Sequence, residues 1–333
     1  MTVQDLARVD IAVLIPCYNE AQTVGIVVES FRRALPAARI YVYDNNSSDG
    51  TAEVARAAGA IVRREERQGK GAVVRRMFAD IDADVYVMVD GDNTYHAPSA
   101  PRLVALLLAG PYDMVNGARV TDSHAAFRPG HTLGNAMLTG LVGYVFGQRT
   151  TDMLSGYKVF SRRYAKVFPA LSGGFEIETE LTVHALEMSM PVAELKTPYG
   201  SRPEGSVSKL STFRDGFRIL KLIGQLVKEE RPLPFFGAVA FLLACLSLGA
   251  GTSVVIEFIH TGLVPRFPTA ILATGAMLAA LLSLFAGLIL DTVTRGRREM
   301  KRLQYLAYRA PGQAATGAAG GTRRAVSSDA RVG

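Results

Sequence analysis

Two carboxylates that flank a glycine, Asp90-Gly91-Asp92, form the segment of the sequence with the clearest chemistry. They follow directly on an apolar run, residues 85–89, that has the composition of a buried strand. Two carboxylates stabilise such a strand end poorly, but they suit a hard divalent cation, Mg²⁺ or Mn²⁺, that also binds phosphate oxygens. Gly91 leaves room for a ligand close to the backbone. We predict that Asp90 and Asp92 bind this metal, although a lone triplet of this kind is also common in turns.

A glycine-flanked lysine, Gln68-Gly69-Lys70-Gly71, complements this triplet. It opens a helix that we predict over residues 71–80. The backbone N–H groups at the start of a helix attract anions, and the Lys70 ammonium adds a positive charge at the same place. The segment therefore predicts a contact with phosphate.

The elements that must position these residues alternate between strands and helices over residues 10–120. We predict strands at 11–15, 40–43, 59–62 and 85–89, a further strand from Met114, and helices at 23–35, 51–58 and 71–80. This order is typical of an α/β sheet with right-handed crossovers, in which ligands bind at the carboxyl ends of the strands. Four polar segments, 16–20, 44–49, 90–94 and 116–119, should therefore meet at one edge.

Two long apolar runs, about 235–259 and 267–293, dominate the C-terminal third. Each exceeds the roughly 20 residues that cross a bilayer, and the short link between them predicts a transmembrane hairpin. The link contains only Arg266, whereas five basic residues follow the second run: Arg295, Arg297, Arg298, Lys301 and Arg302. The positive-inside rule therefore places both ends of the hairpin in the cytoplasm. The alternative is a helical hairpin buried in a soluble fold.

A basic amphipathic helix is predicted between the sheet domain and the hairpin. Apolar and basic residues recur at helical spacing over 213–232, which suits the headgroup region of a membrane or, alternatively, a surface helix packed on the domain. An apolar segment at 133–146 is a second candidate for the interface. We therefore expect a sheet domain at 1–212, the interfacial helix at 213–232, the hairpin at 233–294, and a basic, largely disordered cytosolic tail at 295–333.

Composition restricts the partners and the compartment. The net charge of +7 favours anionic partners, either phosphates or a membrane surface. Nucleic acid is not expected, because the basic residues gather near the membrane and phosphate segments. Cys17 and Cys245 form neither a disulfide framework nor a zinc spacing, and residues 1–10 contain no signal-peptide core. We expect the sheet domain to lie in the cytosol, at the inner membrane, with a multi-pass anchor.

Five motifs, in order, resemble those of family 2 glycosyltransferases: "IPCYNE", "DNNSSDGT", "GKGAV", "DGDNTY" and "LSGYKVFSRR". The resemblance covers about residues 10–230 and points to the polyprenyl-phosphate subgroup, which includes dolichyl-phosphate mannose synthases and bacterial undecaprenyl-phosphate sugar synthases. It implies a GT-A-type, Rossmann-like mixed sheet. It also implies inverting transfer of one sugar from a nucleotide sugar to a polyprenyl phosphate, with a divalent metal.

The resemblance implies a role for each matching residue. The donor is expected to contact Pro16, Tyr18, Glu20, Asp44, Lys70, Asp90, Gly91 and Asp92. The acceptor phosphate is expected to lie near Arg119, Arg202 and Lys209, and the charge of that phosphate makes Arg128 and His131 further candidates. The residues expected to carry catalysis are Asp92, Arg119, Arg202 and Lys209.

The acceptor's own charge reduces the need for a protein base. A phosphate monoester has its second pKa at about 6, so it is largely a dianion at neutral pH and can attack the sugar directly. If a base assists, the candidates are Asp92, Glu176 and Glu178. The basic residues of the last motif, Lys158, Arg162 and Arg163, are either part of a site or a solvated or membrane-facing patch.

Two departures from the family pattern leave the sugar and the nucleotide open. Thr94 stands where many relatives have glutamine, and residues 44–47 read "DNNS" where relatives often have "DDGS". We favour a UDP-sugar. The alternatives are a glycan, glycolipid or protein acceptor, or a non-catalytic nucleotide-binding scaffold. A processive polysaccharide synthase is disfavoured because the chain has no tryptophan for the Gln-x-x-Arg-Trp motif of those enzymes. The oligomeric state, a homo-oligomer included, stays open.

Overall fold

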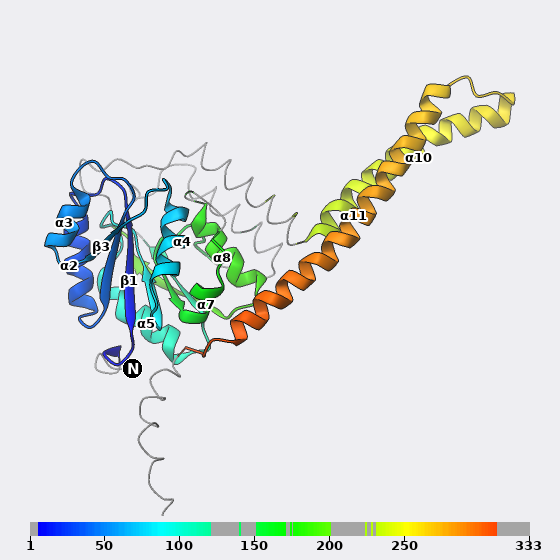
Figure 1. Cartoon of the computed structure of the whole chain (residues 1–333). Helices are drawn as coiled ribbons and strands as arrows, with labels where there is room; N and C mark the ends of the chain where they lie inside the picture. The colour runs from blue at the N-terminus through cyan, green and yellow to red at the C-terminus, as the bar shows by residue number, and fades with distance from the viewer. Residues whose placement is uncertain are drawn as a thin grey trace, which may run out of the picture. The chain divides into compact units, whose positions relative to one another are not determined.

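A mixed seven-stranded sheet, with strands between Ile11 and Pro198, is the centre of the first part of the chain (Figure 1). The computed structural model describes residues 6–120, 140, 151–170, 174, 176–200, 224, 228 and 231–311. The chain divides into two units, Met1–Ile219 with Leu303–Gly333, and Leu220–Arg302. The strands of the first unit are β1 (Ile11–Cys17), β2 (Arg39–Asp44), β3 (Ile61–Arg64), β4 (Val85–Met88), β5 (Met114–Val120), β6 (Lys158–Ser161) and β7 (Val192–Pro198).

The strand order is β3-β2-β1-β4-β6-β5-β7. β1 pairs in parallel with β2 and β4, β2 with β3, and β5 with β7. β6 runs antiparallel to both of its neighbours, β4 and β5. The predicted α/β sheet is therefore confirmed, and a single reversed strand makes it mixed.

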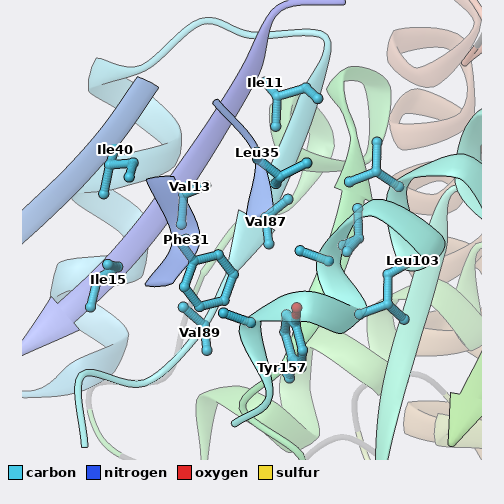
Figure 2. Close-up of a cluster of buried hydrophobic side chains, with 14 of the residues drawn as sticks. Ile11, Val13, Ile15, Phe31, Leu35, Ile40, Val87, Val89, Leu103 and Tyr157 are labelled. Atoms are coloured by element: carbon cyan, nitrogen blue, oxygen red, sulfur yellow. The ribbon is translucent and has the colours of Figure 1, made fainter. Parts of the chain in front are cut away.

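Helices cover the sheet on both sides because each central strand is apolar on both faces. Ile11, Val13 and Ile15 of β1 pack into one core with Phe31 of α2 (Figure 2). The alternate residues of β1 pack into a second core with α4, α7 and α8. The helices are α2 (Val24–Ala34), α3 (Thr51–Ala57), α4 (Lys70–Asp80), η1 (Ala97–Ser99), α5 (Ala100–Ala109), α7 (Arg162–Val167) and α8 (Ile177–Glu187). This alternation is the period of two that a strand imposes.

Two long helices form a hairpin, α10 (Pro232–Thr261) and α11 (Phe267–Leu306), and the second unit contains all of α10 and α11 as far as Arg302. Apart from Pro232 at the start of α10, the buried positions repeat every seven residues and are mostly small: Ala240, Ser247 and Val254 on α10, and Ala273, Ala280, Gly287 and Thr294 on α11. A Cβ on Gly287 would lie 3.0 Å from Cβ of Phe236. The Ser247 hydroxyl donates to the carbonyl of Ala273 at 2.7 Å. Small residues and such a bond let two helices approach closely in a membrane.

Both helices are long and apolar enough to cross a membrane, with mean hydropathies of 2.2 and 2.1 over their most apolar stretches. Large apolar side chains such as Phe241 and Leu242 are 68% and 67% exposed, as lipid-facing residues are. α11 continues to Leu306, past the end at 293 predicted for the apolar run and into the segment expected to be a disordered tail. The reason is that residues 297–306 are mostly strong helix formers. The predictions for 133–146, for nearly all of 213–230 and for the tail after residue 311 fall outside the described residues.

Candidate functional site

The carboxyl ends of the parallel strands meet at one edge of the sheet, where they bring the predicted polar segments together. β1 ends at Cys17, β2 at Asp44, β4 at Met88 and β5 at Val120. Because β6 runs in the opposite direction, its first residue, Lys158, lies at this same edge, opposite Met88 and Asn116. We call the end of the sheet defined by these residues the carboxyl edge.

Hydrogen bonds tie the first two polar segments to each other. The backbone N–H of Asn19 donates to the Ser47 hydroxyl at 2.9 Å, and that of Glu20 donates to the Thr51 hydroxyl at 2.8 Å. The Asn45 side chain connects these two segments to the residues before α4: its amide N–H donates to the Glu65 carbonyl at 2.8 Å. The Asn45 side-chain oxygen also accepts from the N–H of Gly69 at 2.7 Å. The residues that open α4 are thereby fixed at the carboxyl edge.

Lys70 lies between two carboxylates from distant parts of the chain. Its ammonium donates to Oδ1 of Asp90 and to Oε1 of Glu178, the second residue of α8. The Lys70 side chain is 9% exposed and that of Glu178 is 7% exposed. Burial alone would lower the pKa of Lys70, but the Asp90 and Glu178 carboxylates outweigh it and raise that pKa above its ordinary value. Lys70 is therefore held as a cation beside the Asp90 carboxylate.

Two glycines leave the space that the carboxylates occupy. A Cβ on Gly91 would lie 2.3 Å from Oε2 of Glu20, and a Cβ on Gly156 would lie 2.4 Å from Oδ2 of Asp90. The Gly91 carbonyl accepts from the hydroxyl of Thr23, at the start of α2, at 2.7 Å. The backbone around the triplet is thus fixed by α2 and crowded by acidic side chains.

Asp92 is 4% exposed, and its Oδ1 accepts from the Thr94 hydroxyl at 2.6 Å and from the Thr94 N–H at 3.2 Å. Thr94 therefore orients the second carboxylate of the triplet. Among the described residues no group of three or more His, Cys, Asp or Glu side chains has the arrangement of a metal site. Mg²⁺ in phosphate sites binds one or two carboxylates and takes its other ligands from phosphates and water. Asp90 and Asp92 fit such a cation, and the ligand would complete its coordination.

The two carboxylate oxygens of Asp44, at the end of β2, differ in their hydrogen bonding to the described residues. Its Oδ2 accepts from the N–H of Ser47 at 3.3 Å. Its Oδ1 is buried and has no hydrogen-bond partner within the part of the chain that the structure describes. A buried acceptor of this kind is costly unless a donor completes it. The arrangement suits a ligand N–H group.

Arg119, near the end of β5, makes a two-bonded ion pair with Asp152. Its Nε donates to Oδ2 at 2.7 Å, a terminal nitrogen donates to Oδ1 at 2.8 Å, and its backbone N–H adds a bond of 3.1 Å. The guanidinium carbon also lies 5.4 Å from the centre of the Tyr199 ring. Burial alone would raise the pKa of Asp152, but the Arg119 guanidinium outweighs it and lowers that pKa.

A chain of contacts joins this ion pair to the Asp90 triplet. The Tyr199 ring packs at 5.2 Å against the ring of Tyr95, which ends the "DGDNTY" motif. The Tyr95 hydroxyl accepts from the N–H of Gly156 at 2.7 Å, and Gly156 borders Asp90 as described above. Contacts through Tyr199, Tyr95 and Gly156 therefore link Arg119 to Asp90.

Lys158 is fully buried, and the alternative that it belongs to a solvated patch is wrong. Its ammonium donates to Oδ1 of Asn116 at 2.8 Å and to the Met153 carbonyl at 3.3 Å. Burial lowers its pKa to about 8, and the carboxylates of Asp152, Glu178 and Glu194 partly oppose this shift. Lys158 is therefore a buried cation at the carboxyl edge, bonded to Asn116.

Two comparisons with known sequences decide the family. The sequence model of Glycosyl transferase family 2 matches residues 12–168. Glycosyltransferase AglJ of Haloferax volcanii is 33% identical over 303 residues, which cover 89% of this chain and 98% of that protein. The chain belongs to glycosyl transferase family 2. It is therefore a glycosyltransferase that takes its sugar from a nucleotide sugar.

A further relative and a solved structure extend the comparison. A dolichyl-phosphate hexose transferase of H. volcanii is 29% identical over 222 residues, covering 67% of this chain and 96% of that protein. Glucosyl-3-phosphoglycerate synthase from Mycobacterium tuberculosis, in complex with phosphoglyceric acid, has a TM-score of 0.56 at 22% identity, covering 68% of this chain and 84% of that one. The likeness confirms the predicted GT-A-type mixed sheet.

The predicted site residues, together with the two arginines of the last motif that the sequence leaves open, divide into three groups. One group lies at the carboxyl edge: Pro16, Tyr18, Glu20, Asp44, Lys70, Asp90, Gly91, Asp92 and Arg119. A second group lies outside the described residues: Arg128, His131, Arg202 and Lys209. The third lies at the opposite end of β6, where Arg162 pairs with Asp82 and Arg163 with Asp113.

Three residues of the site were not predicted from the sequence. They are Asp152, Tyr95 and Tyr199, which surround Arg119 or join it to the triplet. Asp152 lies three residues before the "SGYK" segment, but nothing in the local pattern pairs it with an arginine 33 positions earlier. Of the candidate bases, Glu178 is already bonded to Lys70, and Asp92 to Thr94.

Proposed function

We propose that this glycosyltransferase transfers a single sugar, with inversion, from a UDP-sugar to a polyprenyl phosphate at the cytoplasmic face of a membrane. The observation that carries the proposal is the chain of contacts that links Arg119 to Asp90 through Tyr199, Tyr95 and Gly156. A nucleotide diphosphate beside Lys70 and an acceptor phosphate beside Arg119 would then lie within one site.

The donor half of the proposal depends on four residues. The unpartnered Oδ1 of Asp44 would accept an N–H of the base, and the Lys70 ammonium would stabilise the negative charge that develops on the departing diphosphate. Asp90 and Asp92 would hold a divalent cation, which supplies further charge stabilisation when bound. Crystal structures of the neighbour from M. tuberculosis contain Mn²⁺ or Mg²⁺ together with UDP, which supports both the metal and the nucleotide.

The acceptor half depends on positioning rather than on a base. A phosphate dianion is already nucleophilic at neutral pH, so its main requirement is a cation that aims it at the anomeric carbon. Arg119 supplies such a cation at the carboxyl edge, and Arg128, His131, Arg202 and Lys209 are proposed to complete the pocket. The named activity of the dolichyl-phosphate hexose transferase supports a polyprenyl phosphate as the acceptor.

The membrane half depends on α10 and α11. We propose that both cross the inner membrane, with the sheet domain and the basic residues after the second span on the cytoplasmic side. A lipid acceptor would then reach the site from the membrane in which the enzyme is anchored. The interfacial helix predicted at 213–232 belongs to the same proposal.

The proposal is tested with a panel of nucleotide sugars. Membranes that contain the full chain are incubated with each donor, undecaprenyl phosphate and Mg²⁺ or Mn²⁺, and the lipid is analysed by mass spectrometry. We expect one donor to give a lipid phosphate bearing one sugar. Phosphoglyceric acid, the ligand of the structural neighbour, serves as a competing soluble acceptor. Transfer to it alone, or no lipid-linked sugar with any donor, would contradict the proposal.

A pair of variants tests the role of the triplet in the same assay. Asp92→Asn removes the charge of a nearly buried carboxylate and should abolish transfer while the protein still accumulates in membranes. Asp82→Asn removes a carboxylate that is 60% exposed and lies away from the carboxyl edge, and it should have little effect. Full activity of Asp92→Asn would refute the metal role.

A further inference from the structure

The ion pair between Arg119 and Asp152 has the features of a positioned functional group. Both partners are largely buried, with side-chain exposures of 16% and 9%. Asp152 accepts two bonds from the guanidinium and one from the Arg119 backbone, so it fixes both the plane of the guanidinium and its distance from β5. Parallel double bonds of this type are stronger and more directional than single ones.

Hydrogen bonds to residues of neighbouring strands also restrain the backbone around Asp152. The Asp152 carbonyl accepts from the Asn116 amide at 2.8 Å, and Asn116 accepts in turn from the buried ammonium of Lys158. The backbone N–H of Thr151 donates to Oε2 of Glu194 at 3.0 Å. The buried Asn116 of β5 and Lys158 of β6, together with the partly exposed Glu194 of β7, therefore restrain the backbone around Asp152.

The Tyr199 ring restrains the guanidinium from another direction. Its centre lies 5.4 Å from the guanidinium carbon, within the range of a cation–π interaction. Its contact with Tyr95 links this restraint to the Asp90 triplet. An arginine held by a carboxylate, a ring and a fixed strand loses little further freedom when a phosphate arrives.

We infer that Asp152 is the positioning residue for the acceptor: it orients the Arg119 guanidinium so that an anionic acceptor phosphate is bound at one fixed place relative to the donor. This role rests on the proposed function, since it assumes that Arg119 meets the acceptor. Asp152 acts through Arg119 and has no direct contact with the sugar or the diphosphate. A small displacement of a positioning group is enough to reduce the rate strongly.

The test measures acceptor and donor kinetics separately, on the full chain in membranes with the donor identified by the panel. Asp152→Asn loses the charge of the pair but keeps the size of the side chain. We expect its KM for undecaprenyl phosphate to rise at least about tenfold. Its KM for the nucleotide sugar, and its affinity for UDP in the presence of Mn²⁺ measured by calorimetry, should change less than about twofold.

A second ion pair on the same sheet provides a matched control. Asp113 pairs with Arg163 through two bonds, with side-chain exposures of 0% and 14%, at the end of the sheet opposite the carboxyl edge. Asp113→Asn therefore breaks a comparable buried pair and should lower thermal stability without changing the KM for the acceptor. A general loss of stability cannot then account for an effect that only Asp152→Asn shows.

A double variant tests whether Asp152 acts through Arg119. If it does, Arg119→Met with Asp152→Asn is no slower than Arg119→Met alone, because the residue to be oriented is already missing. Asp152→Glu keeps the charge and should recover part of the acceptor affinity.

The inference is overturned if Asp152→Asn leaves the acceptor KM unchanged, if donor and acceptor KM rise equally, or if the effects of Arg119→Met and Asp152→Asn are additive. A wild-type enzyme that makes no lipid product would overturn the proposed function, and this inference with it.

Discussion

The substitution Lys158→Met tests whether the Lys158 ammonium is a buried cation at the carboxyl edge. The wild-type ammonium is fully buried, and burial lowers its pKa from 10.5 to about 8. In the unfolded chain the same group binds its proton more tightly. Between about pH 8 and pH 10.5 the unfolded state therefore carries more protons than the folded state, so the free energy of unfolding rises with pH across this window.

The expected rise follows from the size of the pKa difference. One pKa unit corresponds to about 1.4 kcal/mol, so a fall from 10.5 to about 8 corresponds to roughly 3 kcal/mol. Below pH 8 both states carry the proton and this contribution is constant. Methionine removes the cation and with it this pH dependence. It also leaves Oδ1 of Asn116 without the Lys158 donor, which costs about 1–3 kcal/mol and offsets much of the gain at pH 7.

The assay is thermal unfolding of the full chain in detergent, followed by circular dichroism because the chain has no tryptophan. Wild type and Lys158→Met are compared from pH 7 to pH 10.5. Lys196→Met, which removes an exposed lysine of β7, is the control and should keep the wild-type pH dependence. The reasoning is refuted if Lys158→Met shows the same rise in unfolding temperature between pH 8 and pH 10.5 as the wild type.

Two glycine substitutions, one in each unit, test how closely the residues around each glycine are packed. Gly156→Ala places a Cβ 2.4 Å from Oδ2 of Asp90, so the carboxylate must move. We expect sugar transfer, measured in membranes, to fall at least about tenfold while the circular dichroism spectrum is retained. Gly287→Leu places a Cβ 3.0 Å from Cβ of Phe236 and separates α10 from α11. We expect a lower unfolding temperature in detergent, because overpacking costs about 1–3 kcal/mol.

Each glycine substitution has a control at a more open position. Gly200→Ala would meet its nearest heavy atom at 3.7 Å and should keep full transfer activity. Gly275→Leu starts from a position on α11 whose Cβ would meet no atom within 4 Å, so its unfolding temperature should change little. Equal activities of Gly156→Ala and Gly200→Ala, or equal unfolding temperatures of the two leucine variants, would contradict the respective packing argument.

The donor half of the site was predictable because its signals are local. Each polar segment follows an apolar strand of its own, and parallel strands bring their carboxyl ends together whatever their order in the sheet. This is why Asp44, Lys70 and Asp90 were predicted to converge, and the described residues of the structure place them at one edge. Gly91 was a second local signal, because a glycine between two aspartates leaves room for a ligand close to the backbone.

The acceptor half was less predictable because β6 is short and reversed. A run of four residues gives no signal of strand direction, yet direction decides which end of the "LSGYKVFSRR" motif reaches the site. The reversal brings Lys158 to the carboxyl edge and sends Arg162 and Arg163 to the opposite one. The sequence alone does not separate these three basic residues, because all of them lie within one motif.

The charges at the carboxyl edge explain why a site for anions still needs more cations. Around the triplet and Arg119, the structure brings together the cations Lys70, Arg119 and Lys158 and a larger set of carboxylates: Glu20, Asp44, Asp90, Asp92, Asp152, Glu178 and Glu194. Lys70 is already paired with Asp90 and Glu178, and Arg119 is paired with Asp152. A nucleotide diphosphate and a phosphate dianion would add several negative charges to a poorly screened site. The proposed function therefore requires positive charge beyond these three residues: a divalent cation at Asp90 and Asp92, and the basic residues predicted at 128–131 and 202–209.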